Sequence, residues 1–290
     1  MSFKIITDTT ANLSRILTAQ YDITVIPFSY FIDNREYTCT DIDTFDDTAY
    51  YDAIKNGTYV TTSQINPQVY MDYMSPFLSE GKDVLFIGLS SGISGSFASA
   101  QIAASMLSEE YPKRTILLVD SLGASLGEGL IAIKAAQCRK KGMDIHQTYE
   151  HLLKLRDRIY QVFIVDDLMH LRRTGRLSNI SAAIGSVLGI KPLLKGNSEG
   201  KIVAFGKIRG RRQVIKALAE KYFTLAQNTG IVGISYAGCK EDAEYLMSLL
   251  KEKFSQIELL LVKHEPVTGS HIGPGALALY FEGADNVREY

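Results

Sequence analysis

Short runs of β-branched and aromatic residues alternate with helical segments through the first half of the chain. The predicted strands are residues 3–7, 23–32, 84–89 and 115–119, and the predicted helices are residues 48–56, 67–80 and 128–141. Each strand is short, apolar and bounded by turn residues. Pro67 opens one helix and Gly142 follows another, as expected at helix ends. This alternation predicts a parallel sheet covered by helices on both faces, an α/β/α domain.

The second half of the chain has a different pattern. Residues 191–195 and 201–209 flank a glycine-rich turn, which predicts a hairpin. Further strands are expected at 159–165, 231–236, 257–263 and 276–281, and helices at 167–172, 180–188, 213–227 and 241–254. A hairpin among helices predicts a mixed sheet. We therefore expect two α/β domains, residues 1–158 and residues 159–290.

The composition is typical of a globular protein, with 46% hydrophobic and 22% charged residues among 290. A net charge of −1 gives no general attraction to nucleic acid. The first residues lack the apolar stretch of a signal peptide, and no segment reaches the ~20 apolar residues that span a bilayer. Three widely separated cysteines argue against a disulfide framework or a zinc site. We therefore expect a soluble cytoplasmic protein that does not bind nucleic acid.

Four hydroxyl-rich loops accompany the predicted parallel sheet. They are residues 7–10, 61–64, 90–96 and 120–121. Ligands of such sheets bind beyond the carboxyl ends of the strands, so we expect these loops to meet. Hydroxyls together with free backbone N–H groups at a helix start can hold a carboxylate or a phosphate without basic side chains. Helix capping is the alternative role of each loop, but four loops at one edge favour a binding site.

Nucleotide and metal sites are not expected. The first strand is not followed by Gly-x-Gly-x-x-Gly, and the loop at residues 90–96 lacks the lysine of a Walker loop. The five histidines form neither His-x-x-x-His nor His-Glu-x-x-His, so we expect no metal ligands.

A catalytic alternative remains for Ser94. Residues 92–96 nearly match the Gly-x-Ser-x-Gly nucleophile elbow of hydrolases. In a serine lipid esterase, His271 would be the base and Asp166 or Asp167 the orienting acid. The extra residues between the preceding strand and Ser94 argue against a sharp elbow.

Two features of the second half point to binding. His271 lies among glycines in residues 269–275, where we expect a tight loop that holds the imidazole close to the backbone. Arginines cluster at Arg172, Arg173 and Arg176, and again at Arg209, Arg211 and Arg212. These clusters are either solvated surface or a docking patch for a phosphate or an acidic partner.

Seven segments, in order along nearly the whole chain, resemble the DegV family, which includes the fatty-acid-binding subunits of bacterial fatty acid kinase. They are residues 5–13, 62–64, 89–96, 119–121, 171–178, 190–194 and 271–275. The resemblance implies an α/β/α N-terminal domain, an α/β C-terminal domain and a ligand between them.

The resemblance also implies residue roles. Those implied for binding a fatty acid carboxylate are Thr62, Ser94 and His271, with Ser63, Gly95 and Ser121 as further candidates in the ligand-binding loops. Those implied for kinase docking or phosphoryl transfer are Arg176 and Arg209. The apolar candidates for the lining of an acyl-chain tunnel are Phe28, Tyr30, Phe31, Phe97, Ile102, Ile184, Val187, Leu188, Phe205 and Phe281.

The implied function is that of a carrier and not of an enzyme. It would bury one long-chain fatty acid and present the carboxylate to an ATP-dependent kinase subunit. The acyl phosphate would then pass to an acyltransferase of phospholipid synthesis, with transient contact at a membrane surface. We expect no cofactor and no metal. A regulatory protein that docks through its arginines and carries no lipid is a further alternative.

Overall fold

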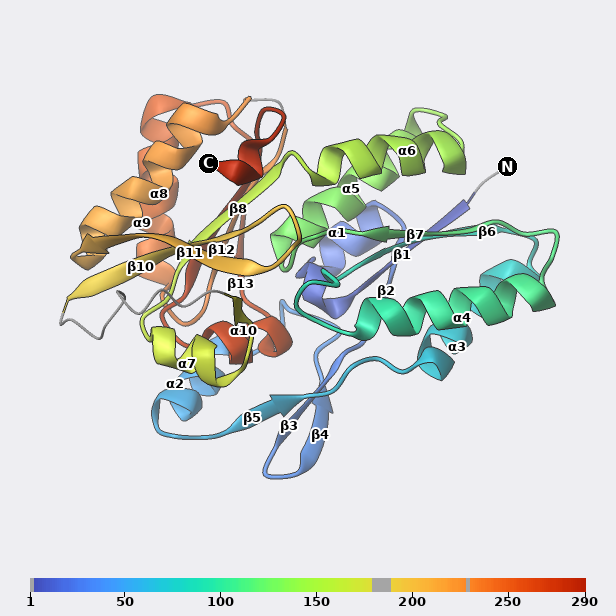
Figure 1. Ribbon diagram of the computed structural model, residues 1–290, viewed down its shortest axis with the longest axis horizontal. Coiled ribbons are helices and arrows are strands. Elements are labelled where there is room, and N and C mark those ends of the chain that lie inside the picture. The colour runs from blue at the N-terminus through green and yellow to red at the C-terminus, as the bar shows by residue number, and fades with distance from the viewer. Residues whose placement is uncertain (1–2, 179–188, 228–229) are drawn as a thin grey trace. The chain divides into compact units, whose positions relative to one another are not determined.

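The computed structural model describes residues 3–178, 189–227 and 230–290 (Figure 1). The chain divides into two compact units. The first contains Met1–Phe45 and Thr61–Arg156, and the second contains Asp46–Val60 and Asp157–Tyr290. The later boundary lies close to the predicted one. The segment Asp46–Val60 differs from the prediction, because it belongs to the second unit.

The first unit is built on a four-stranded parallel sheet in the order β2-β1-β6-β7. Its strands are β1 (Phe3–Asp8), β2 (Ile23–Ile26), β6 (Asp83–Gly88) and β7 (Ile116–Asp120). Figure 1 shows α5 and α6 on one face and α3 and α4 on the other. These helices are α3 (Pro67–Ser79), α4 (Ser96–Glu110), α5 (Leu126–Lys140) and α6 (Ile145–Arg156). The predicted α/β/α arrangement is confirmed.

The strand predicted at residues 23–32 is in fact two strands in two sheets. Pro27 follows β2 and has no N–H to donate to a ladder, so pairing stops there. The chain then forms β3 (Ser29–Ile32), which lies between β4 (Arg35–Thr38) and β5 (Val60–Thr62) in a small sheet. The single-strand prediction was wrong because an apolar run does not reveal where a chain changes sheets.

The second unit contains a seven-stranded mixed sheet in the order β13-β12-β14-β8-β10-β11-β9. Its strands are β8 (Ile159–Ile164), β9 (Leu177–Ser178), β10 (Ile190–Gly196), β11 (Ile202–Arg209), β12 (Val232–Tyr236), β13 (Leu259–Lys263) and β14 (Leu277–Glu282). β10 and β11 form the predicted antiparallel hairpin, whereas β12 and β13 run parallel. The mixed sheet is therefore confirmed. The helix predicted at residues 180–188 lies outside the described residues.

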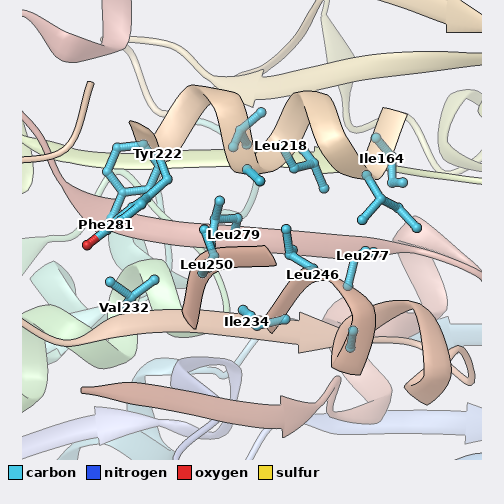
Figure 2. Close-up of a cluster of buried hydrophobic side chains, with 14 of the residues drawn as sticks. Ile164, Leu218, Tyr222, Val232, Ile234, Leu246, Leu250, Leu277, Leu279 and Phe281 are labelled. Atoms are coloured by element: carbon cyan, nitrogen blue, oxygen red, sulfur yellow. The ribbon is translucent and has the colours of Figure 1, made fainter. Parts of the chain in front are cut away.

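The core of the second unit lies between this sheet and two helices, α8 (Arg211–Leu225) and α9 (Lys240–Lys253). Figure 2 shows Leu218 and Tyr222 of α8 above the strands. The Tyr222 ring meets the Phe281 ring edge-on, with centroids 5.2 Å apart. Full burial of each such side chain stabilises the fold by roughly 1.5–3 kcal/mol. This core fixes the strands whose ends carry the polar residues considered below.

Three short helices of the second unit group together away from α8 and α9 (Figure 1). They are α2 (Asp47–Lys55), α7 (Leu168–Arg173) and α10 (Pro266–Ile272). Two buried tyrosines explain why α2 belongs here. The Tyr50 hydroxyl donates to the Pro266 carbonyl at 2.8 Å, and the Tyr51 hydroxyl donates to the His264 carbonyl at 3.0 Å. Such long-range bonds have no local sequence signal, so the domain boundaries predicted from pattern could not include them.

The remaining helical elements are short. They are α1 (Arg15–Gln20) and two 3₁₀ turns, η1 (Thr9–Ala11) and η2 (Val287–Glu289). Within the described ranges, no helix combines the length and the apolar character needed to cross a bilayer.

Replacing Tyr51 with Phe tests the role of α2 in the second unit. The ring stays buried, but the His264 carbonyl loses its donor, so we expect the free energy of unfolding to fall by about 1–2 kcal/mol. Tyr59→Phe is the matched control. Tyr59 is 80% exposed, so loss of its hydroxyl should change the free energy of unfolding little. Urea unfolding measures both. Equal stabilities of the two variants and the parent would contradict this role for Tyr51.

Candidate functional site

The four hydroxyl-rich loops meet at one edge of the first unit, as the parallel sheet requires. Asp8 at the end of β1 accepts the Leu89 N–H through Oδ2 at 3.4 Å. Ser90 N donates to the Gly123 carbonyl at 2.9 Å and so joins the loops that follow β6 and β7. The sheet edge therefore carries one connected set of loops and not four separate caps.

The loop that carries Thr62 is fastened to the loop that carries Ser94. The Ser96 Oγ accepts the Ile65 N–H at 3.2 Å and lies 3.2 Å from the Ser94 Oγ. The Ser94 Oγ in turn accepts the Ser96 N–H at 3.2 Å. These bonds bring two of the predicted carboxylate-binding segments together within the first unit.

Close packing at Gly95 reinforces this junction. A Cβ at that position would lie 2.5 Å from the Gln64 side-chain amide, so only glycine allows the amide to rest on the loop backbone. Gly95 therefore lets the two loops approach closely, and its part in ligand binding stays a prediction.

The other loop candidates have different surroundings. Thr62 ends β5 and is half-buried, whereas Ser63 is exposed and donates its N–H to the Ser29 carbonyl at 3.2 Å. Ser121 is fully buried, and its hydroxyl donates to the Gly123 carbonyl at 3.2 Å and accepts the Gly123 N–H at 3.1 Å. The contacts of Ser121 indicate that it shapes its loop.

The prediction missed two buried carboxyl groups behind these loops, those of Asp8 and Glu128. The Glu128 side chain accepts a hydrogen bond from the Thr7 hydroxyl at 2.8 Å. Burial raises the pKa of Asp8 to about 6, and burial together with the nearby Asp8 raises the pKa of Glu128 well above its usual range. Gly129 allows the helix that carries Glu128 to pack closely against the turn after β1, because a Cβ at Gly129 would collide with the Ala11 carbonyl. The sequence shows Glu128 only as a single acidic residue at the start of a predicted helix, which does not indicate that it pairs with Asp8.

In the second unit, His271 lies in the last turn of α10 and not in the predicted tight loop. The Glu265 side chain caps this helix by accepting the Thr268 N–H at 2.5 Å. Pro266 occupies the first turn, and Gly273, with φ of 81°, ends the helix. The loop prediction was wrong because the glycines after His271 mark the end of a short helix.

The His271 imidazole is buried close to a guanidinium. Burial, together with the neighbouring Arg176 and His170, lowers the pKa of His271 to about 3. The Thr174 hydroxyl lies 3.4 Å from the His271 carbonyl, and the Arg176 guanidinium donates to the Thr174 carbonyl. The imidazole is therefore neutral at physiological pH, with a guanidinium near it.

The two candidate arginines are not brought together. Arg176 precedes β9, whose Leu177 pairs with Ile202 at the start of β11, whereas Arg209 ends β11. The eight residues from Ile202 to Arg209 are seven steps of extended strand, a span of about 23 Å. Only Arg176 belongs to the surroundings of His271.

The acids needed by a serine esterase are engaged elsewhere. Asp166 pairs with Lys191 at 2.6 Å and with Arg211 at 3.2 Å. Asp167 caps α7, and its side chain accepts the Met169 N–H at 2.8 Å. Because both acids are engaged in these contacts, the geometry of the second unit does not favour a catalytic triad.

A separate hollow of about 400 Å³ lies in the second unit at the carboxyl end of β12. Its charged residues include Asp47, which is 4.0 Å from Lys263, and Asp242, which is 2.8 Å from Arg211. Burial raises the pKa of the Cys239 thiol to about 11, so the thiol is protonated. Among the described residues, no group of three or more potential ligands is arranged to hold a metal ion.

The tunnel candidates divide by burial. Ile102 is 54% exposed on α4, so its assignment to a closed tunnel was wrong. Phe281 belongs to the core of the second unit, and Phe205 packs against that core. The buried candidates of the first unit are Phe28, Tyr30 and Phe97, with Phe31 partly buried. Ile184, Val187 and Leu188 lie outside the described residues.

Comparison with known proteins agrees with this fold. The family model described as uncharacterised protein, DegV family, matches residues 2–283. A DegV domain-containing protein of Clostridium perfringens is 35% identical over 287 residues, which cover 97% of each chain.

Two solved structures are similar over nearly the whole chain. The fatty acid binding DegV family protein of Streptococcus agalactiae is 31% identical with a TM-score of 0.85, and the match covers 98% of this chain and 99% of that one. DegV, a fatty acid binding protein from Bacillus subtilis, is 30% identical with a TM-score of 0.85, covering 98% and 100%. The resemblance seen in the seven sequence segments is confirmed, and this chain belongs to the DegV family.

Proposed function

We propose that this protein binds one long-chain fatty acid and holds its carboxylate with the hydroxyls of Thr62 and Ser94 and the imidazole of His271. The relatives from Streptococcus agalactiae and Bacillus subtilis, which are described as fatty acid binding proteins, support the ligand class. The observation that carries the assignment is the Ser96 hydroxyl, which joins the Thr62 and Ser94 loops into one hydroxyl-lined surface.

Neutral donors suit a ligand that enters and leaves. An unpaired buried cation would cost several kcal/mol whenever the site is empty. Hydroxyls and a neutral imidazole avoid this cost, because they can hydrogen-bond to one another or to water. The lowered pKa of His271 keeps its ring in the neutral form, which donates one N–H to a carboxylate.

The acyl chain requires an apolar enclosure. Each methylene left in water costs ~0.8 kcal/mol, so a long chain is held only where most of it is buried. Phe28, Tyr30, Phe31 and Phe97 are the side chains that we assign to this enclosure, since they are apolar, at least partly buried and in the unit that carries the hydroxyl loops.

The carrier then presents the carboxylate to an ATP-dependent kinase subunit. A carboxylate oxygen attacks the γ-phosphorus of ATP on the kinase, which yields an acyl phosphate and ADP. Arg176 is the residue that we assign to the phosphoryl group, because a guanidinium matches phosphate geometry and this one lies near His271. The acyl phosphate passes to an acyltransferase during transient contact with a membrane surface. The protein itself is a carrier and not the enzyme.

Ser94→Ala tests carboxylate binding. A lost hydrogen bond to a charged group costs about 1.5–3 kcal/mol, so we expect the dissociation constant for oleate to rise by about tenfold or more. Ser105→Ala on the exposed face of α4 is the matched control and should bind as the parent does. Displacement of a fluorescent fatty acid measures both.

Mass spectrometry of a denaturing organic extract of the purified protein shows which lipid it carries. We expect one fatty acid per chain. An extract without lipid, combined with no measurable oleate binding, would contradict the proposed function, and stoichiometric labelling of Ser94 by a fluorophosphonate would favour the esterase.

Ser96→Ala tests whether the two loops act as one site. Ser96 is buried, and its removal leaves the Ile65 N–H without this acceptor, so we expect a loss of about 1–3 kcal/mol in unfolding free energy. Oleate affinity should fall as well, although Ser94 is intact. Unchanged affinity at a temperature where the variant is folded would show that the loops bind independently.

Arg176→Ala tests presentation to the kinase. We expect oleate affinity to change less than twofold and the ATP-dependent formation of acyl phosphate by the kinase complex to fall by at least about tenfold. Arg209→Ala is the matched control, since Arg209 lies at the other end of β11. Equal transfer rates for the two variants would contradict the role of Arg176.

A further inference from the structure

Asp8 and Glu128 form a buried carboxyl pair that the proposed carrier function does not use. Both side chains are fully or almost fully buried, and the Thr10 hydroxyl lies between them. The Thr10 Oγ1 is in hydrogen-bonding contact with the Asp8 Oδ1, and it is 2.9 Å from the Glu128 Oε2. A hydroxyl has one proton to donate, so it cannot serve two carboxylates. Both contacts can be hydrogen bonds only if one of the two carboxyls is protonated and donates its own proton to the Thr10 oxygen.

The positions of the other donors identify that acid. Asp8 accepts the Thr10 N–H at 2.9 Å and the Leu89 N–H at 3.4 Å, so backbone donors stabilise its charge. Glu128 accepts from the Thr7 hydroxyl through Oε1 and from one backbone N–H, that of Asp8, so it has one backbone donor fewer than Asp8. Its Oε2 is the atom that contacts Thr10. In this arrangement the Thr10 hydroxyl donates its hydrogen bond to Asp8. Glu128 is the protonated partner and Asp8 the charged one.

Few ionisable groups face the pair. From β1 and α5 the two carboxyls face each other. From α3 comes Tyr70, whose pKa is raised by burial and by the nearby carboxyls. β6 and η1 contribute backbone N–H groups and hydroxyls. Among the described residues, no basic side chain contributes to the pKa shift of either carboxyl. With no basic side chain of that part of the chain acting on it, the pair keeps a proton readily.

A short polar path leads from the pair to Ser94. The Asp8 Oδ2 accepts the Leu89 N–H at 3.4 Å. The carbonyl of the next residue, Ser90, accepts the Ser94 N–H at 3.2 Å. An anion bound at Ser94 is thus close to a buried negative charge with no basic side chain between them.

We infer that Asp8, Thr10 and Glu128 hold one shared proton at neutral pH, and that binding of a ligand carboxylate at Ser94 is linked to protonation of Asp8. The linkage rests on the proposed function, whereas the shared proton does not. A bound carboxylate disfavours the Asp8 anion, so Asp8 takes a proton from solvent on binding. By reciprocity, a lower pH tightens binding and a higher pH promotes release.

Infrared spectroscopy tests the shared proton without ligand. At pH 7 the parent should show the C=O band of a buried protonated carboxylic acid, and Glu128→Gln should lack it. Gln is a matched replacement, because its NH₂ donates to Thr10 and its oxygen accepts from Thr7 as the protonated Glu does. A spectrum unchanged by the substitution would overturn the shared proton.

Oleate affinity between pH 6 and 8.5 tests the linkage. For the parent we expect the dissociation constant to rise between about fivefold and tenfold with pH, a usual size for coupled sites. Glu128→Gln should keep this profile, since Asp8 still titrates, and Asp8→Asn should flatten it. His271 cannot be the source, because its pKa is about 3. A merely structural role would weaken binding equally at every pH.

The outcomes are distinguishable. Binding with a flat profile in the parent would overturn the linkage and leave the proposed function intact. The absence of oleate binding at every pH would overturn the proposed function and, with it, the linkage. If Asp8→Asn does not fold, calorimetry of oleate binding to the parent in two buffers of different ionisation enthalpy decides. The linkage requires proton uptake on binding, and binding without proton uptake would refute it.

Discussion

The Ser96 hydroxyl holds the loop of Thr62 against the loop of Ser94, and the rest of the proposed binding surface depends on this junction. A parallel sheet brings the ends of its strands to one edge, but it does not fix how the loops beyond them pack. The bond from the Ile65 N–H and the contact with the Ser94 Oγ do so. Gly95 completes the junction by leaving room for the Gln64 amide. Hydroxyls are thereby placed before a ligand arrives, which lowers the entropy lost on binding.

The second unit contributes chemistry of a different kind. It keeps imidazoles neutral by burial. His264 has a pKa lowered to about 3, and its ring lies 2.8 Å from the Ser235 hydroxyl and 3.2 Å from the Thr268 hydroxyl. Tyr51 holds the carbonyl of the same His264, so the start of α10 is anchored from α2. The helix that carries His271 is therefore fixed at its beginning by the hydrogen bond from Tyr51.

Burial of ionisable groups is the property shared by both units. In the first, Asp8 and Glu128 are buried with hydroxyls and backbone N–H groups around them. In the second, His271 is buried beside cations. Burial disfavours the charged form of an ionisable group, so these groups shift toward their neutral forms. The two units thus arrive at uncharged hydrogen-bond donors through opposite protonation changes: a carboxyl that gains a proton and an imidazole that loses one.

Local patterns predicted most of the fold, and long-range contacts account for what was missed. Strand and helix periods located the parallel sheet, the hairpin at β10 and β11 and the loop carrying Ser94, because each depends on residues close in sequence. The assignment of residues 46–60 depends on tyrosine hydrogen bonds to residues more than 200 positions away. The carboxyl pair likewise joins Asp8 to a residue 120 positions later. Ile102 was misplaced because an apolar residue on a helix does not reveal which face is exposed.

A crystal structure of the protein with oleate bound tests the central claim most directly, because it locates the carboxylate and both units at once. We expect carboxylate oxygens within hydrogen-bonding distance of the Thr62 and Ser94 hydroxyls and of the His271 ring, with the acyl chain enclosed by apolar side chains. A carboxylate held away from both Ser94 and Thr62, or an acyl chain lying on the surface, would contradict it.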